Sequence, residues 1–364
     1  MPSRLQTLIS AETERPPRDR ARRSGGSRRE AGSWREGVDV YARSHLGRSL
    51  VALLTSVVPF IGLWVLMYLS LQTSYLLTLA LAVPTAGFLL RTYIIFHDCA
   101  HGSFLRGKRA NAWLGGFLAL LVFTPFAKWR HDHAVHHATA GDLDRRGRGD
   151  VPTMTVDEYN AEDRRGHFWY RLFRQPMVMF GIGPVYSMLI MQRKVDHTDR
   201  PRIQRSVRLT NAALVFIVAG LCYLIGWQAL LLVETPLIAL AGGAGIWLFY
   251  VQHQFDDVYW ERTAQWNYAD AALRGSSYLH LPKILQFFTG NIGLHHVHHL
   301  SPKIPGYYLQ RAHDNNEIFH DVPKVSLWQG LRAVRFKLWD EEASCLVTWR
   351  EWGAKVARTA SPSL

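Results

Sequence analysis

Long apolar stretches alternate with polar segments along the 364-residue chain, and the apolar stretches come in two close pairs. The first pair covers residues 50–71 and 74–96, and the second covers residues 207–226 and 228–251. Each stretch has about the 20 residues that a helix needs to cross the hydrocarbon core of a bilayer. Because only a few residues separate the two members of a pair, the pattern predicts two hairpins of transmembrane helices.

A fifth apolar stretch, residues 112–127, is shorter than a comfortable crossing. Trp113 stands near its start, and Lys128, Trp129 and Arg130 follow its end. This mixture of aromatic and basic residues is typical of segments at the depth of the lipid headgroups. We therefore expect a re-entrant or interfacial segment here, with a buried helix of a soluble domain as the alternative.

The distribution of basic residues predicts the orientation. The chain has 42 Lys and Arg against 29 Asp and Glu, and most of the basic residues lie in 1–48, 128–208 and 252–364. The hairpin turns near Thr73 and Trp227 carry none. Basic loops stay on the cytoplasmic side. The pattern thus predicts a multi-pass protein of the inner membrane, with both termini and the long middle segment in the cytoplasm.

The pattern predicts a membrane domain at residues 49–325. The segments before and after it are polar and basic. Residues 1–48 are rich in arginine, and we expect a disordered cytoplasmic arm. Residues 326–364 mix tryptophans with basic residues, which predicts a cytoplasmic tail along the membrane surface. No helix-turn-helix, zinc finger or aromatic-interleaved basic motif is present to read bases. The positive charge therefore favours anionic lipid as a partner, and no nucleic acid.

Histidines are concentrated in three clusters, HDCAH, HDHAVHH and HHVHH, which begin at His97, His131 and His295. Within each cluster, spacings of three or four residues place imidazoles on one face of a helix. Imidazole is the commonest metal-binding side chain. The eight histidines with this spacing are His97, His101, His133, His136, His137, His295, His298 and His299.

The predicted topology places all three clusters at the cytoplasmic edge of the membrane, where they can share one pocket. A structural zinc takes four protein ligands and a catalytic zinc three, so eight imidazoles favour two ions. Nitrogen donors are compatible with iron, copper, zinc or nickel. A transporter would need such groups inside its spans, whereas the four predicted spans contain no histidine. An enzyme is therefore favoured, and a metal-binding membrane transporter is a remote alternative.

Three longer motifs, HDCAHGSF, WRHDHAVHHATAGDLD and GNIGLHHVHHLSPKIPGYYL, occur in this order. With this order and spacing the chain resembles the membrane fatty acid desaturases, most closely the bacterial acyl-lipid enzymes related to omega-6 (Δ12) desaturases. The resemblance covers about residues 50–325. It implies an all-α integral membrane protein with four transmembrane helices in two hairpins and a cytoplasmic helical cap that carries a histidine-rich di-iron site.

Members of this family hold two irons with the histidines of the three clusters and one more between the second and third. The resemblance therefore assigns the eight histidines above as ligands, with His253 in VQHQFDD as the candidate ninth. The alternative for His253 is an interfacial histidine bonded to a neighbour. Asp98 and Asp132 stand beside ligand histidines and are expected to orient imidazole N–H groups, unless they are exposed loop charges. Asn291, four residues before His295, is a further candidate to bond a ligand or a bound water.

The resemblance implies an O2-dependent oxidoreductase that introduces a cis double bond, of Δ12 or omega-6 type, into the acyl chain of a membrane lipid. The chain has no cytochrome b5-type haem motif, GxGxxG fingerprint or cysteine array. We therefore expect a separate electron donor, a ferredoxin. A di-iron hydroxylase of alkyl or carotenoid substrates shares the three clusters and is the alternative. The clusters are also compatible with Δ9 and omega-3 products and with glycerolipid, coenzyme A or carrier-protein substrates.

Overall fold

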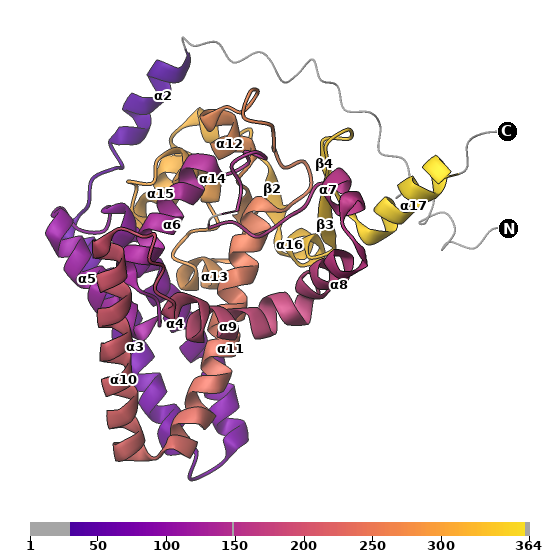
Figure 1. The fold of residues 1–364 in the computed structure, drawn as a ribbon. Coiled ribbons are helices and arrows are strands. Elements are labelled where there is room, and N and C mark those ends of the chain that lie inside the picture. Colours follow the sequence, from indigo (N-terminus) through magenta and orange to yellow (C-terminus); the bar gives the residue numbers. More distant parts are fainter. Residues whose placement is uncertain (1–29, 148, 361–364) are drawn as a thin grey trace, which may run out of the picture.

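The computed structural model describes residues 30–147 and 149–360, which form four long helices beneath a cap of shorter elements (Figure 1). Each long helix is long and apolar enough to cross a membrane. In hydrocarbon the backbone must hydrogen-bond within its own segment, which is why such continuous apolar stretches are helical. The four helices are α3 (Leu46–Ser70), α4 (Tyr75–His101), α10 (Pro201–Ile225) and α11 (Trp227–His253).

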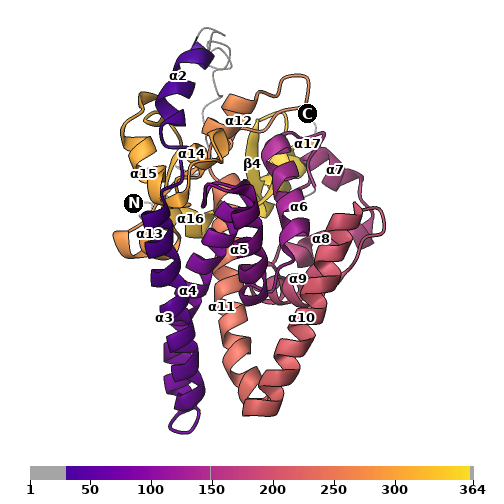
Figure 2. The same cartoon turned by 90° about the vertical axis from the view of Figure 1, so that its left-hand side faces the viewer.

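Short turns join α3 to α4 and α10 to α11 at the end far from the cap (Figures 1 and 2). At the cap end, α4 and α11 continue past the predicted spans, which stop at residues 96 and 251. The backbone hydrogen bonds continue although the side chains become polar, and α4 ends only where Gly102 adopts φ +70°. These extra helical turns carry His97, His101 and His253, so the three side chains stand on continuous helices.

The predicted short apolar segment, residues 112–127, covers most of helix α5 (Lys108–Leu121) and the first two residues of helix α6 (Phe126–Thr139). They are bent by 104° at a break of four residues, the shape of either a broken span or a re-entrant loop. Phe123 in the break has φ +50°, and both helices pack against α4. The bend directs α6, and with it the second histidine cluster, towards the end of α4.

A second irregular apolar segment follows the cap's first helices and was not predicted. It consists of the π-helix η2 (Met177–Ile182), α9 (Gly183–Leu189) and the 3-10 turn η3 (Met191–Arg193). Both η2 and α9 pack along α11. Sequence analysis had assigned this segment to the cytoplasmic loop between the two hairpins.

The cap is mostly helical, but it also contains two small sheets, which corrects the expectation of an all-α protein. Strand β1 (Tyr278–His280) pairs in parallel with β2 (Lys324–Ser326), and β3 (Phe336–Asp340) pairs antiparallel with β4 (Cys345–Thr348). Strands of three to five residues are too short for a clear alternation of polar and apolar positions. The cap helices are α7 (Val156–Ala161), α8 (Arg164–Phe173), α12 (Tyr268–Arg274), α13 (Lys283–Phe288), α14 (His295–Leu300), α15 (Gly306–Asp314), η4 (Glu317–Phe319), α16 (Leu327–Ala333) and α17 (Trp349–Ala360).

The C-terminal segment differs from the predicted interfacial tail, because residues 327–348 belong to the body of the cap. All of β3 is buried, and Trp339 is only 2% exposed and packs against Trp260 with ring centroids 5.3 Å apart. Tryptophan suits a membrane surface and a protein core equally well, so composition alone did not distinguish them. Trp328 remains exposed on α16.

The N-terminal arm also differs from its prediction in part. Residues 1–29 lie outside the described residues. The following residues form α2 (Glu30–Asp39), and Val38 is buried in the main core of the cap. Tyr41 accepts a hydrogen bond from Asn315, which ties the segment after α2 to the end of α15.

Candidate metal centre

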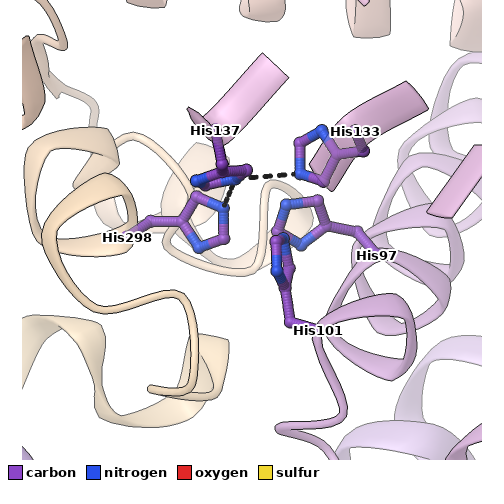
Figure 3. Close-up of side chains that lie close together, drawn as sticks. All are labelled: His97, His101, His133, His137 and His298. Carbon is purple, nitrogen blue, oxygen red and sulfur yellow. Dashed lines mark hydrogen bonds between the residues drawn. The ribbon is translucent and has the colours of Figure 1, made fainter. Parts of the chain in front are cut away.

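Four helices bring nine histidines together where the long helices meet the cap. His97 and His101 lie on the last turn of α4, and His253 is the last residue of α11. The shorter helices α6 and α14 each supply three. Figure 3 shows five of these side chains, from α4, α6 and α14, directed towards a common centre. The six from the shorter helices are His133, His136, His137, His295, His298 and His299.

The nine rings form two groups, each with one nitrogen per ring within 4.8 Å of all the others. The first group has five histidines and the second has four. The rings of His137 and His299 stack at 4.1 Å, so the groups are direct neighbours. The first group is His97, His101, His133, His137 and His298, and the second is His136, His253, His295 and His299.

Two members of the second group have outward contacts that bear on their tautomers. His136 donates from Nδ1 to Asp150 Oδ1 at 2.5 Å, and His253 donates from Nδ1 to the Gly275 carbonyl at 3.1 Å. In neutral rings, both Nε2 atoms then carry lone pairs without a proton. These two atoms lie 3.1 Å apart, and Nε2 of His253 lies 2.9 Å from Nε2 of His295. Two facing lone pairs cannot hydrogen-bond to each other, but they can share a cation.

The first group also brings Nε2 atoms close together, although Nδ1 of His137 and of His298 is buried without a hydrogen-bond partner among the described residues. Nε2 of His137 lies 3.1 Å from that of His133 and 3.0 Å from that of His298. His97 points Nδ1 at Asp98 Oδ1, 3.2 Å away. Within the described residues, Nε2 of His97 and of His101 is buried and has no hydrogen-bond partner. A buried polar atom without a partner is costly, and a metal ion would satisfy both.

The donor set fits two transition-metal ions. Bonds of about 2.0–2.1 Å from a metal to imidazole place two adjacent ligand nitrogens about 3 Å apart, as observed in both groups. Burial, and then the neighbouring imidazoles, hold the pKa of His295, His298 and His299 well below the usual value. The rings are therefore neutral near pH 7, which is the form that binds metal.

Two carboxylates contact histidine rings from outside the two groups. Asp98 contacts His97 and accepts a hydrogen bond from Gly306 N at 2.8 Å. Asp150 contacts His136 and accepts from Gly147 N at 3.1 Å. Burial alone would raise the pKa of Asp150, but the hydrogen bonds from His136 and Gly147 outweigh it and lower this pKa below the usual value. Asp150 is therefore ionised at neutral pH.

Asp150 was not predicted from the sequence, because this residue lies 14 residues beyond His136, across a loop. Gly149 brings the loop back with φ +82°, so close to α6 that a Cβ would lie 2.7 Å from the Asp132 carbonyl. An acidic residue directly after the glycines of GRGD, close behind a histidine cluster, was the available signal.

The other two candidates have different contacts. The Asp132 carboxylate lies 3.8 Å from Lys128, one turn earlier on α6. Asn291 has φ +63° and donates to the Gly306 carbonyl at 3.2 Å. This hydrogen bond holds the turn before α14 against Gly306, whose N–H donates to Asp98. Trp129, read from sequence as an interfacial anchor, stacks on His133 at 4.3 Å.

A fully buried arginine supports the Asp150 loop. Arg174 donates to the carbonyls of Pro152 and Phe336 and to Oε1 of Gln254, the residue after His253. It therefore joins the loop, the end of α11 and strand β3 at one point. The Arg174 side chain lies inside the cap, whereas the sequence predicted only one more residue of a basic segment.

A cavity of about 480 Å³ reaches the second group from the side of this loop. His136 and His253 line it, and Phe249, Leu143 and Trp260 contribute apolar walls. Arg146, which pairs with Glu158, also lines it. A polar or apolar molecule in this cavity would contact the second histidine group directly.

Comparisons with known proteins identify the family of the chain. The family pattern described as Fatty acid desaturase matches residues 73–329. A fatty acid desaturase of Bacillus subtilis (strain 168) is 48% identical over 313 residues, which cover 86% of this chain and 89% of the relative. The chain belongs to the fatty acid desaturase family. It is thus an oxidoreductase, and the resemblance inferred from the three motifs is confirmed.

More distant relatives of the desaturase carry more specific names. A Synechocystis sn-1 oleoyl-lipid 12-desaturase is 26% identical over 242 residues, 61% of this chain and 63% of the relative. A Synechocystis sn-1 acyl-lipid omega-3 desaturase (ferredoxin) is 27% identical over 238 residues, 60% of this chain and 62% of the relative. The desaturase is therefore distantly similar both to a 12-desaturase and to an omega-3 desaturase.

Proposed function

We propose that the nine histidines hold two iron ions and that the desaturase introduces a cis double bond into the acyl chain of a membrane glycerolipid. In the balanced reaction, –CH2–CH2– with O2, two electrons and two protons gives –CH=CH– and two waters. Two bound irons would supply the redox chemistry that activates O2. The observation that carries the proposal is the convergence of buried imidazole Nε2 atoms about 3 Å apart.

The protein's own groups position the ligands and the substrate. Asp98 and Asp150 orient His97 and His136, as carboxylates commonly do around metal-bound imidazole. Burial of the rings keeps water away from the site. The cavity lined by His136 and His253 has apolar walls suited to an acyl chain. We propose that the chain lies there with one methylene pair facing the second histidine group.

The regiochemistry, the donor and the topology belong to the same proposal. A Δ12 or omega-6 product is supported by the distant similarity to an sn-1 oleoyl-lipid 12-desaturase. A ferredoxin as electron donor is supported by the name of the omega-3 relative. The basic segments favour a cytoplasmic cap in the inner membrane. A cytoplasmic cap would face a soluble donor.

The test is the lipid profile of a host that expresses the desaturase together with a ferredoxin and its reductase. Gas chromatography and mass spectrometry of double-bond adducts should reveal new dienoic chains, and the purified protein should contain two irons. His136→Ala should abolish both signals, whereas His197→Ala, at an exposed histidine, should retain them. Histidine-dependent hydroxylated chains without new double bonds would refute desaturation and favour the hydroxylase alternative.

A further inference from the structure

One apolar segment is not used by the site or by the four long helices. Residues 176–191, PMVMFGIGPVYSMLIM, form a run of 16 residues without a charge. They fold into η2 and α9, which are too short to cross a membrane. The run lies inside the basic segment 128–208, with Arg171 and Arg174 before it and Arg193 and Lys194 after it.

Much of this segment's surface is apolar and uncovered by protein. Met177 is 79% exposed and Ile182 is 64% exposed, and Tyr186, Leu189 and Ile190 are also exposed. A contiguous apolar surface of this kind marks a contact with a membrane or with another protein. The covered side packs on α11.

The contact with α11 sets the depth of the segment. Pro184 lies against Gly242, and the Phe180 carbonyl lies against Gly243, so closely that a Cβ on either glycine would clash. Gly242 is 15 residues from Trp227, or about 23 Å at 1.5 Å per residue. The hydrocarbon core is about 30 Å thick. If Trp227 marks its far edge, the glycines lie within the half of the core nearer the cap.

Arg193, just after the segment, gives a second depth marker. Its guanidinium donates to Asn211 Oδ1 at 3.1 Å and to the Phe123 carbonyl at 2.5 Å. Asn211 is 14 residues from the end of α10 at Ile225, or about 21 Å. Phe123 lies in the break between α5 and α6, where a carbonyl lacks a helical partner. Two irregular segments therefore meet at one depth, with an arginine satisfying the freed carbonyl.

We propose that residues 177–191 are embedded in the cytoplasmic leaflet and that lipid acyl chains cover their exposed side chains. The absence of charge, the basic flanks and the two depth markers all fit a lipid partner. The segment then anchors the cap without crossing the bilayer. This inference rests on the proposed membrane orientation of the desaturase.

The first test uses native methionines in single-copy nanodiscs of phosphatidylcholine and phosphatidylglycerol. After aqueous hydroxyl-radical labelling, mass spectrometry should show Met177 less modified than Tyr268, although Met177 is 79% exposed and Tyr268, in the cap, only 39%. Methionine is the more readily oxidised residue. Stronger labelling of Met177 than of Tyr268 would overturn the proposal. Protection seen only when two copies share a disc would instead assign the surface to a second copy.

A second test measures depth directly. A fluorophore is attached to Ile182→Cys in a Cys222→Ala, Cys345→Ala background, where Cys99 is buried. Phe216→Cys on α10 is the lipid-facing control, and Glu342→Cys in the cap is the aqueous control. The label at 182 should be quenched by aqueous iodide about tenfold less than the label at 342, because water is excluded from hydrocarbon.

The controls separate failure of this inference from failure of the orientation on which it rests. If the label at 216 is shielded and the label at 182 is as accessible to iodide as that at 342, only the leaflet proposal is wrong. If the label at 216 is itself fully accessible, the membrane orientation is wrong as well. Nitroxide lipids labelled near the headgroup should quench 182 more strongly than lipids labelled at the chain end.

Discussion

Asp150→Asn is the sharpest perturbation of the proposed metal centre, because it changes one charge and almost no volume. The native carboxylate accepts from His136 Nδ1 at 2.5 Å, and its side chain is 17% exposed. A hydrogen bond to a charged group contributes about 1.5–3 kcal/mol, and loss of such a partner typically costs 10–100-fold in metal affinity or activity. The amide oxygen can still accept from His136, but without charge.

We therefore expect Asp150→Asn to weaken iron binding about tenfold and Asp150→Ala to approach 100-fold, or about 1.4 and 2.7 kcal/mol. The assay is a competition between the protein and an iron chelator, followed by desaturase turnover with saturating lipid. Asp144→Asn is the matched control on the same loop. Asp144 pairs with Arg262 at the surface, where solvent and salt screen such pairs.

The expected pattern is specific. Iron affinity should fall in the order wild type, Asp150→Asn, Asp150→Ala, while the melting temperature of the metal-free protein changes little. Asp144→Asn should bind iron like the wild type. An Asp150→Asn protein that keeps iron affinity within about twofold of wild type would contradict a role for this carboxylate in orienting His136.

Three further predictions concern stability and are measured by thermal unfolding in detergent. Gly149→Ala should destabilise the protein by more than about 1 kcal/mol, because φ is +82° and the Cβ would meet the Asp132 carbonyl, whereas Gly116→Ala, with open space around it, should not. Arg174→Met should lower the melting temperature sharply, since each buried acceptor left without its donor costs about 1–3 kcal/mol. An unchanged melting temperature would argue against a stabilising role for the Arg174 hydrogen bonds. Burial lowers the pKa of Lys337 to about 8, so the unfolded chain binds more protons between about pH 8 and the ordinary value of 10.5. Stability should rise across that interval, and Lys337→Met should remove that rise.

The long helices and the histidine clusters could be predicted because their signals are local in sequence. Twenty apolar residues in hydrocarbon must form a helix, and spacings of three and four align imidazoles on a helix wherever it lies. The ends of the long helices were less predictable, because α4 and α11 continue into polar sequence up to His101 and His253. Hydropathy reports the lipid boundary, whereas the helix ends where its hydrogen bonds end.

The missed features depend on residues far apart in the chain. Asp150 reaches His136 only because Gly149 turns the loop back onto α6. Strand β1 needs its partner β2, more than 40 residues later, and Trp339 becomes a core residue only when the cap closes over β3. The packing of η2 and α9 on α11 was not predicted, because the basic residues on both sides of this segment indicated a cytoplasmic loop.

The sequence by itself determined the four apolar helices, the family and the side chains able to bind metal, because each follows from local composition, spacing or motif. Tertiary structure decided how nine imidazoles divide into groups of five and four, and which carboxylates hold them. It also decided which tryptophans are buried and where the uncharged segment packs. The physical reason is that ligand grouping and burial are set by contacts between distant segments, whose geometry exists only after the helices pack.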